Sequence, residues 1–478
     1  MIRNRLGLII GLLVLLSGLF TAPEGVSPEA WRVLALGAMM VIWWVSEAVP
    51  LPVTALLPVL LLPWLGVMPV SEAARPYSSD IVFLFLGGFL LALAIEKWNL
   101  HRRISLQIVR RTGNSANRIV LGFMLATALL SMWISNTAAT VMMLPIALSV
   151  VELLKSDEEK VGRGTRNFGL ALMLGIAYAA NIGGMATLIG TPPNVVMAGI
   201  LEAQHNIVIG FLEWMKIGIP VSVVLLVLTY VLLTEVLYPN RIGRFERGEF
   251  AIRDALTSLG TMSKQEKRVL AVFCLTGAMW VSRQWLSDVL GWESLRDSGI
   301  AILGGILLFV VPSGDGTRGT LLDWSDTRRL PWGILLLFGG GLSLANALSW
   351  VGWVDRVGEV FSGWGAVEWI WITLGLVAIS LLLTEVMSNV ALISVFVPVV
   401  AAIAVGMDVH PTVMAIPVTL AASCAFMLPM STPPNAIVFA SGMVRVHQMV
   451  KAGIVLNAVA ILVIWLFSNY LVPALFGA

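Results

Sequence analysis

Long apolar stretches separated by short polar segments run along almost the whole chain. Eleven of them approach or exceed the length that a helix needs to cross the hydrocarbon core of a bilayer, about 17 to 25 residues. The pattern therefore predicts an all-α polytopic membrane protein with about eleven transmembrane helices. The predicted spans are 6–21, 31–49, 51–67, 81–97, 168–200, 213–238, 267–285, 298–312, 331–350, 413–442 and 452–472.

Two further apolar stretches, 119–148 and 366–405, are broken in the middle by a polar step. The steps read Ser135-Asn136-Thr137 and Ser388-Asn389-Val390. Lipid cannot satisfy the backbone groups that such a step frees from a helix, so the backbone there has to be buried in protein or line a cavity. We expect each stretch to form a re-entrant hairpin that carries its polar step at the tip.

A second polar motif is also written twice, each time inside a predicted span. It reads Gly190-Thr191-Pro192-Pro193-Asn194 in the first half of the chain and Ser431-Thr432-Pro433-Pro434-Asn435 in the second. We expect broken helices at 190–194 and 431–435. Irregular segments at corresponding places in two halves of a membrane protein point to the binding site of a secondary transporter.

A third repeated element indicates an internal duplication. Gly87-Gly88 and Trp98 recur 252 residues later as Gly339-Gly340 and Trp350, while the Ser-Asn step recurs at 253 and the Pro-Pro-Asn run at 241. A Gly-Gly pair alone is typical of helix packing, but three elements in one order indicate two related halves. The chain then divides into scaffold helices at 1–80, a first repeat at 81–238, a linker with scaffold helices at 239–330, and a second repeat at 331–478.

Lysine and arginine in the loops predict the orientation. The basic segments lie near 3–5, 97–118, 155–166, 241–268, 318–329 and 445–451, and the loops between them are poor in basic residues. Basic loops stay in the cytoplasm, so we expect a multi-pass protein of the plasma (inner) membrane with a cytoplasmic amino terminus and an external carboxyl terminus. The two hairpins then enter from opposite sides, which defines an inverted-topology repeat.

Composition narrows the class of protein further. Hydrophobic residues make up 58% of the chain and charged residues 12%, and the net charge of +2 is too small to indicate nucleic acid as a partner. Cys274 and Cys424 lie far apart without metal-ligand spacing. The sequence contains no HExxH, no GxSxG and no paired aspartates, so we do not expect an enzyme. A channel is the other alternative, but it has no need of two related sites and a co-ion.

The chemistry at the tips follows from the scarcity of charge. No ionisable residue lies within three positions of Asn136, Asn194 or Asn435, and Glu385 precedes Asn389 by four. Helix ends supply N–H groups for a carboxylate and carbonyl oxygens for a cation, and an Asn side chain offers both an oxygen and an NH2 group. The sequence therefore predicts an anion site beside uncharged, oxygen-lined sites for sodium ions.

Three side chains near the tips have two interpretations each. Ser131 and Thr384 lie one helical turn before Ser135 and Ser388, where their hydroxyls either add sodium ligands on the same face or bond back to their own helix. Glu385 either pairs with a basic residue or takes up a proton.

At these residues the chain resembles the divalent anion/sodium symporter family, also called INDY-type carriers. The similar features are the duplicated Ser-Asn step, the paired Pro-Pro-Asn runs and the early segment Trp44-Val45-Ser46-Glu47-Ala48-Val49-Pro50-Leu51-Pro52. The resemblance spans nearly the whole chain. It implies a homodimeric, elevator-type symporter that couples sodium to a di- or tricarboxylate, with a C4-dicarboxylate such as succinate, malate or fumarate as first choice. A sodium-independent exchanger and carriers of citrate, sulfate or metal oxyanions are the alternatives.

The resemblance also assigns residues to the site. It implies that substrate carboxylates contact Ser135, Asn136, Thr137, Ser388, Asn389, Val390, Thr432 and Pro433. It places one sodium among Ser131, Ser135, Asn136 and Gly184, and the other among Thr384, Met387, Asn389 and Ser431. Exchangers of the family replace sodium by a basic side chain, and neither set contains one, which favours cation coupling.

Val390 departs from the fullest family pattern, which has threonine at this position. One hydroxyl is thus missing from the second half of the substrate site. A hydrogen bond to a charged group contributes about 1.5–3 kcal/mol, so its loss is large enough to change which carboxylate is preferred.

Overall fold

The computed structural model describes residues 2–20, 22–155, 162–243, 246–292, 294–314, 319–362 and 369–476. Within these ranges the regular elements are helices, and Pro312 and Thr320 form an isolated bridge. The all-α class predicted from the apolar pattern is therefore confirmed.

The helices follow one another in four groups along the chain. The first comprises α1 (Ile2–Ser17), α2 (Pro28–Ser46), α3 (Leu51–Thr54), α4 (Leu57–Trp64), α5 (Val70–Ala74) and η1 (Arg75–Ser78). The second comprises α6 (Asp80–Lys97), α7 (Leu100–Thr112), α8 (Ala116–Ser131), α9 (Asn136–Lys155), α10 (Arg163–Met185), α11 (Pro192–His205), α12 (Phe211–Val231) and the π-helical turn η3 (Leu232–Leu237). The third comprises α13 (Glu246–Thr257), α14 (Lys264–Val281), α15 (Arg283–Leu290), α16 (Asp297–Val310) and η4 (Trp324–Arg329). The fourth comprises α17 (Trp332–Trp350), α18 (Trp353–Ser362), α19 (Trp369–Thr384), α20 (Asn389–Gly406), α21 (Thr412–Ala422), α22 (Pro433–Ala440) and α23 (Val446–Phe476).

The second and fourth groups contain the same series of elements. Each has a long apolar helix (α6, α17), a shorter helix (α7, α18), two arms around a Ser-Asn step (α8–α9, α19–α20), a broken pair (α10–α11, α21–α22) and a long final helix (α12, α23). This is the order that the predicted repeats 81–238 and 331–478 require. The opposite orientation of the two halves stays a prediction.

Some predicted features fall on residues outside the described ranges. These are residues 366–368 of the second hairpin, 477–478 of the second repeat, 244–245, 293 and 315–318 of the linker, and 156–161 of one basic loop.

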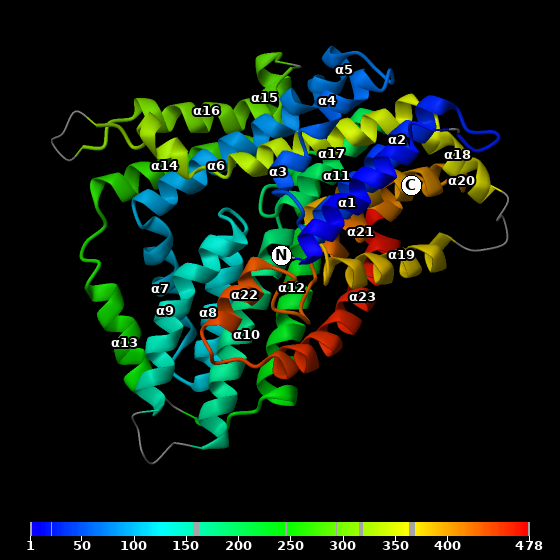
Figure 1. Ribbon diagram of the computed structural model, residues 1–478. Coiled ribbons are helices and arrows are strands. Elements are labelled where there is room, and N and C mark those ends of the chain that lie inside the picture. Colours follow the sequence, from blue (N-terminus) through cyan, green and yellow to red (C-terminus); the bar gives the residue numbers. More distant parts are fainter. Residues whose placement is uncertain are drawn as a thin grey trace.

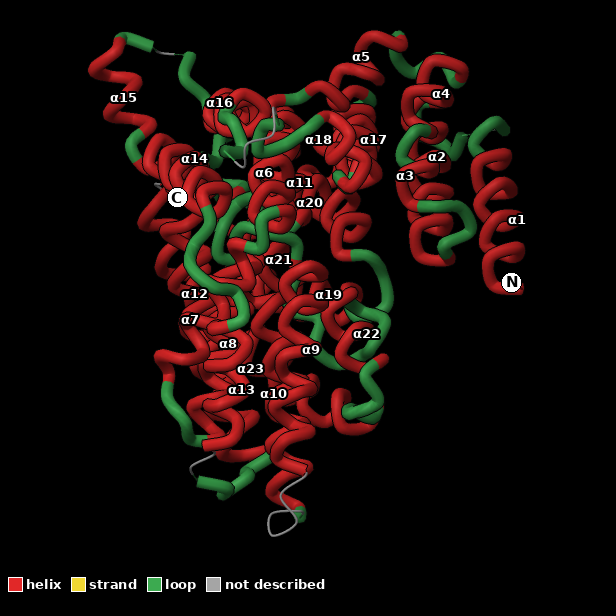
Figure 2. The backbone as a smooth tube through the Cα atoms, turned by 90° about the vertical axis from the view of Figure 1, so that its left-hand side faces the viewer, coloured by secondary structure: helices red, strands yellow, loops and turns green. Residues whose placement is uncertain are grey.

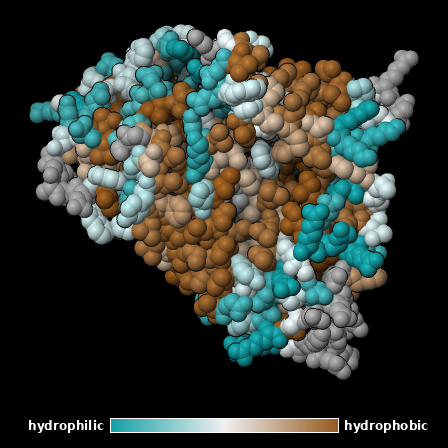
Figure 3. All heavy atoms as spheres, turned by 180° about the vertical axis from the view of Figure 1, so that it is seen from behind, coloured by the Kyte–Doolittle hydropathy of each residue, from teal (hydrophilic) through white to brown (hydrophobic). Residues whose placement is uncertain are grey.

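The chain is a multi-pass membrane protein. In the described ranges, eight helices are long and apolar enough to cross a membrane, and nine if α14 and α15, bent by 74° at their junction, count as one span. Large hydrophobic side chains stay exposed on their outer faces, such as Val227 on α12 and Leu462 on α23. Figure 3 shows a broad hydrophobic area across the middle of one face, with hydrophilic residues gathered toward its ends. Eleven crossings remain a prediction.

The first group of helices packs against α17, and the third group packs against the related helix α6. In Figure 1, α6, α14, α16 and α17 run across one end of the molecule, and α8, α9, α10 and α12 extend away from them. The helix α6 packs on α14 and α16, whereas α17 packs on α2 to α5. Figure 2 shows α1 to α4 side by side at one edge of the bundle.

The related helices α6 and α17 meet at a pair of phenylalanines. The rings of Phe85 and Phe338 contact edge to face, with centroids 4.9 Å apart and planes at 87°. Both side chains are buried. The two residues are 253 positions apart, the same separation as the Ser-Asn steps.

The glycines beside these rings correct the alignment of the two halves. A Cβ atom on Gly87 would overlap the backbone of Ala301, and one on Gly340 would overlap the backbone of Ala55. Gly87 and Gly340 are thus equivalent at a separation of 253, so the 252-residue register assigned to the Gly-Gly pair is wrong by one. A third glycine, Gly341, makes the sequence alignment ambiguous at this point.

Both broken helices are interrupted before their Pro-Pro-Asn run, not within it. The first break spans 186–191 and the second 423–432, in place of the expected 190–194 and 431–435. Proline is favoured at the first position of a helix, where its missing N–H has no helical partner. The proline run therefore begins the next helix, and the spans predicted at 168–200 and 413–442 are each two helices.

Candidate functional site

The first Ser-Asn tip brings three oxygen atoms together. Ser131 ends α8, Asn136 begins α9, and Ala180 lies on α10. The hydroxyl oxygen of Ser131 lies 2.6 Å from Asn136 Oδ1 and 2.7 Å from the carbonyl oxygen of Ala180. We call these three atoms the first oxygen cluster.

The second tip repeats this arrangement at equivalent residues. Thr384 ends α19, Asn389 begins α20, and Ala422 ends α21. Thr384 Oγ1 lies 2.8 Å from Asn389 Oδ1 and 2.6 Å from the carbonyl oxygen of Ala422. These three atoms form the second oxygen cluster.

Each cluster contains three oxygens and a single hydroxyl hydrogen. This hydrogen can bond to only one acceptor at a time. In each cluster the hydroxyl oxygen therefore faces one of the other two oxygen atoms with no hydrogen between them. A cation resolves this conflict, and carbonyl and amide oxygens at broken helices are the ligands that sodium takes in transporters. Ser131 and Thr384 bond across to α10 and α21, unlike Thr127, which bonds back to Phe123 of its own helix. The hydrogen bonds of both hydroxyls thus differ from the back-bonding alternative, and their role as sodium ligands stays a prediction.

Two of the other predicted ligands lie at the first cluster. A Cβ atom on Gly184 would lie 2.6 Å from Asn136 Oδ1, so the α10 backbone passes directly against this amide. Ser135 is exposed, and its hydroxyl oxygen accepts from the backbone N–H of Ala138 at 3.2 Å. Ser135 thus caps the start of α9.

The remaining predicted ligands of the second sodium are placed less directly. The Ser431 hydroxyl is bonded to Glu385, 2.6 Å from Oε2 and 3.1 Å from the backbone oxygen. Met387 is partly buried in the turn between α19 and α20 and packs against the core. The structure thus brings Ser431 and Met387 to the second tip, but neither residue contributes an atom to the second oxygen cluster.

The asparagines of the Pro-Pro-Asn runs hold the breaks together. Asn194 Nδ2 donates to the carbonyl oxygen of Thr187 at 2.9 Å and to that of Gly184 at 3.4 Å. Asn435 Nδ2 donates to the carbonyl oxygens of Ala425 at 2.9 Å and Leu428 at 3.1 Å. Both side chains are fully buried. Their role is thus to satisfy carbonyls that the breaks leave without helical partners.

Two glycines that the sequence analysis missed bring the final helices against the breaks. A Cβ atom on Gly218 of α12 would lie 2.6 Å from the Met185 carbonyl oxygen, and one on Gly453 of α23 would lie 2.5 Å from Met427 Cα. The glycines are 235 positions apart in equivalent helices. An alignment of α12 with α23 would have identified them.

The helix α10 of the first half also contacts the second break. Asn181 Nδ2 on α10 donates to Thr432 Oγ1 at 3.1 Å, and the Tyr178 hydroxyl donates to the Phe426 carbonyl oxygen at 2.9 Å. In addition, α22 packs on α9, and α11 packs on α20. Each half therefore contributes a short helix to the hairpin arm of the other half. Asn181 and Tyr178 carry no sequence motif and were not predicted.

The predicted substrate residues differ in exposure. Thr137 and Pro433 are exposed, and Ser388 is half-buried. Thr432 is 4% exposed and is held by Asn181, while Val390 is 8% exposed and belongs to the hydrophobic core. The exposed part of the site thus lies at the first tip and at the start of α22.

Glu385 binds backbone amides, not a basic residue. Its carboxylate accepts from Phe426 N and Met427 N, both at 3.0 Å, and from Leu428 N at 3.2 Å. It also accepts from Asn457 Nδ2 at 2.8 Å and from the Ser431 hydroxyl. The pairing with a basic residue suggested by the sequence is absent among the described residues.

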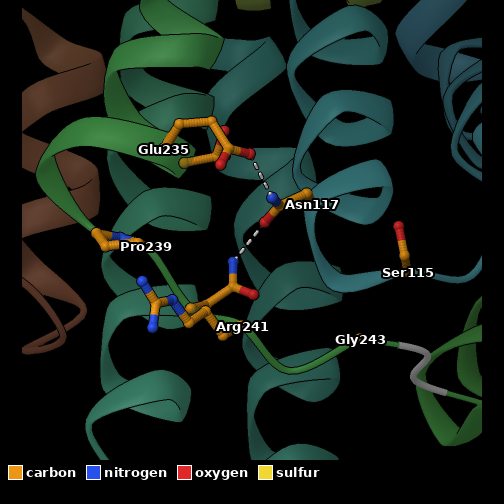
Figure 4. A pocket seen from close by; sticks show the side chains of 8 residues that line it. Ser115, Asn117, Glu235, Pro239, Arg241 and Gly243 are labelled. Atoms are coloured by element: carbon orange, nitrogen blue, oxygen red, sulfur yellow. Dashed lines mark hydrogen bonds between the residues drawn. The ribbon is translucent and has the colours of Figure 1, made fainter.

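A separate polar cavity of about 260 Å³ lies at the far end of α8. Figure 4 shows Asn117 bonded to Glu235 and to Asn240 there, beside Arg241. Ser115 lines this cavity at the start of α8, and 16 residues of helix, about 24 Å, separate it from Ser131. The cavity is therefore not part of the site at the tips.

This arrangement of broken helices and paired tips is that of a secondary transporter. The model of the sodium:sulfate symporter transmembrane region matches residues 3–477, and the chain belongs to this family. The chain is 40% identical over 483 residues to the sodium-dependent dicarboxylate transporter SdcS of Staphylococcus saprophyticus, covering 100% of this chain and 93% of that one. It is 40% identical over 479 residues to SdcS of Staphylococcus aureus, covering 99% and 92%. The resemblance read from the motifs is confirmed, as is a transporter in place of an enzyme.

Solved structures share the fold at low sequence identity. The Alcanivorax borkumensis YdaH transporter matches with a TM-score of 0.59 and 11% identity, covering 92% of this chain and 98% of that chain. Neisseria gonorrhoeae MtrF matches with a TM-score of 0.57 and 14% identity, covering 98% and 94%. These similarities concern the fold alone.

Proposed function

We propose that the protein is a secondary active transporter that couples sodium to the uptake of a C4-dicarboxylate such as succinate, malate or fumarate. The observation that carries the proposal is the pair of equivalent oxygen clusters, each without a basic residue. The relatives named above, which are sodium-dependent dicarboxylate transporters, support this choice of ion and substrate.

In the proposed mechanism one sodium ion binds at each oxygen cluster and the substrate binds between the tips. The ions supply positive charge that the site itself lacks, and Asn136 and Asn389 each contact one ion and one end of the dianion. The protein works as a homodimer in the plasma membrane. The two halves face opposite ways, and the hairpins 119–148 and 366–405 move with the substrate as an elevator against the scaffold helices.

Uptake of labelled succinate into proteoliposomes tests the proposal. We expect uptake to rise at least about tenfold when an inward sodium gradient replaces choline. Two sodium ions balance the charge of a dianion, so faster uptake at an inside-negative potential would show that more than two sodium ions enter with each substrate. Loss of two bound ions removes contacts worth about 1.5–3 kcal/mol each. Equal uptake in sodium and choline would favour the sodium-independent exchanger.

Cysteine labelling tests the proposed orientation. We expect a cysteine near Ser149 on α9 to react from the cytoplasm and one near Gly406 on α20 to react from outside. Glu152→Cys and Val405→Cys suit the purpose because both side chains are exposed, whereas a side chain on Gly406 would overlap Gly358. The exposed native thiol of Cys274 is replaced by serine first. Reaction of both sites from one side contradicts the inverted repeat.

Val390→Thr tests the substrate side of the second tip. Restoring the hydroxyl should shift the relative affinities for succinate, citrate and sulfate by about tenfold and leave the sodium dependence nearly unchanged. Competition assays with each anion measure the ranking. Because Val390 is only 8% exposed, the test also shows whether a side chain at this position reaches the substrate. An unchanged ranking with an altered sodium dependence would mean that this side chain faces the ion.

A further inference from the structure

The buried carboxylate of Glu385 lacks a counter-charge. Its five partners are three backbone amides, a hydroxyl and a side-chain amide, all neutral and all donating. Four of these partners are N–H groups, which can only donate, so both carboxylate oxygens are held as acceptors, as in an ionised carboxylate. The ion pairs found in the described part of the chain do not include it. A buried charge is costly unless it is paired.

The equivalent position in the first half of the chain carries no charge. Met132 occupies the position equivalent to Glu385, 253 residues earlier, and its carbonyl oxygen accepts from the Thr187 hydroxyl at 2.5 Å. The first break is held by neutral donors, namely Trp214 Nε1 on the Met185 carbonyl oxygen and the Ser222 hydroxyl on that of Ile182, both at 2.9 Å. The two breaks thus share their geometry but differ in charge.

The charge of Glu385 lies next to the second oxygen cluster. Thr384, which contributes the hydroxyl of that cluster, is the preceding residue. The amides that Glu385 accepts from belong to residues 426–428 in the break between α21 and α22. This break leads to Thr432, one of the predicted substrate contacts. A cation in the second cluster would therefore balance the charge of the carboxylate that holds the break at residues 423–432.

We propose that Glu385 is a positioning residue that couples sodium at the second cluster to the arrangement of residues 423–432, and that it makes this cluster the tighter of the two sodium sites. The inference rests on the proposed function. With sodium bound, the carboxylate is balanced, the three amides stay bonded and Thr432 is presented to the substrate. Without sodium, the uncompensated charge loosens the segment, so that substrate binds well only after the ion.

The test measures sodium binding without transport. Thermal unfolding of the purified full-length protein is followed as sodium chloride replaces choline chloride at constant ionic strength, for the wild type, Glu385→Gln and Glu385→Asp. Glu235→Gln, at an exposed carboxylate bonded to Asn117, is the matched control. Hydrogen exchange of the amides of 426–428 is measured in the same two salts.

We expect Glu385→Gln to raise the sodium concentration for half-maximal stabilisation at least about tenfold, the effect of removing an opposite charge within about 10 Å at an effective dielectric constant near 20. Glu385→Asp, which keeps the charge, should lie closer to the wild type, and Glu235→Gln should match it. Sodium should protect the amides of 426–428 in the wild type.

Three results would overturn the inference. If Glu385→Gln melts lower in both salts with an unchanged sodium midpoint, the carboxylate is only structural, and the proposed function stands. If the wild type itself shows no stabilisation by sodium, the proposed function fails together with the inference. Should Glu385→Gln fail to fold, wild-type amides of 426–428 that sodium does not protect overturn it as well.

Discussion

Replacing either Asn136 or Asn389 by alanine should abolish sodium-coupled uptake. Each asparagine contributes the Oδ1 atom of one oxygen cluster, and each is proposed to donate its NH2 group to the substrate. Loss of both contacts at once, at about 1.5–3 kcal/mol each, should reduce uptake of labelled succinate to below about 1% of the wild-type rate. The two variants should be equally impaired, because the residues are equivalent.

A matched control separates this effect from misfolding. Asn346→Ala removes a half-buried asparagine on α17, near the end of α11 that lies away from the tips. It should transport at close to the wild-type rate. All three variants should purify as folded protein with similar melting temperatures in choline. If only one of the two tip variants loses activity, the equivalence of the clusters is contradicted.

Asn194→Ala and Asn435→Ala should each destabilise the protein strongly. Each change leaves two buried carbonyl oxygens of a break without their donor, at about 1–3 kcal/mol per group. We expect the melting temperature to fall by about 2–6 °C, with loss of uptake because the cluster carbonyls move with the break. Thermal unfolding of the purified protein measures the first effect.

The isosteric variant Asn435→Asp distinguishes a lost donor from a cavity. It fills the same space but faces the carbonyl oxygens of Ala425 and Leu428 with another oxygen. It should be at least as unstable as the alanine variant. Wild-type stability of Asn435→Asp would show that donation by this side chain is not needed.

The sequence predicted those features of the fold that are determined within one helix or one turn. Apolar length identified the long helices, and the Ser-Asn steps identified both turns. The helix breaks were predicted a few residues too late in the chain. Proline ends a helical pattern in the sequence, but in the structure it belongs to the helix that it begins, as at Pro192 and Pro433. The register of α6 against α17 was wrong by one, since only packing against Ala55 decides which pair of the three glycines is equivalent.

The site was predictable only where a side chain carries the chemistry. Spacing placed the Ser131 hydroxyl one helical turn before Ser135, and the family resemblance grouped it with Asn136. The third oxygen of each cluster is a backbone carbonyl of an alanine, which no motif marks. The role of Glu385 was equally hidden, because its partners are backbone amides some forty residues away.

The exchange of short helices between the halves has a consequence for how such a chain arises. The helix α22 covers part of α9 and α11 covers part of α20, so neither half buries its own hairpin arm completely. A protein of half this length, carrying one copy of each motif, would leave those surfaces exposed and could function only with a second subunit. Gene fusion would then have made an intersubunit contact permanent and allowed the two copies to diverge, so that one carries an acid where the other carries methionine.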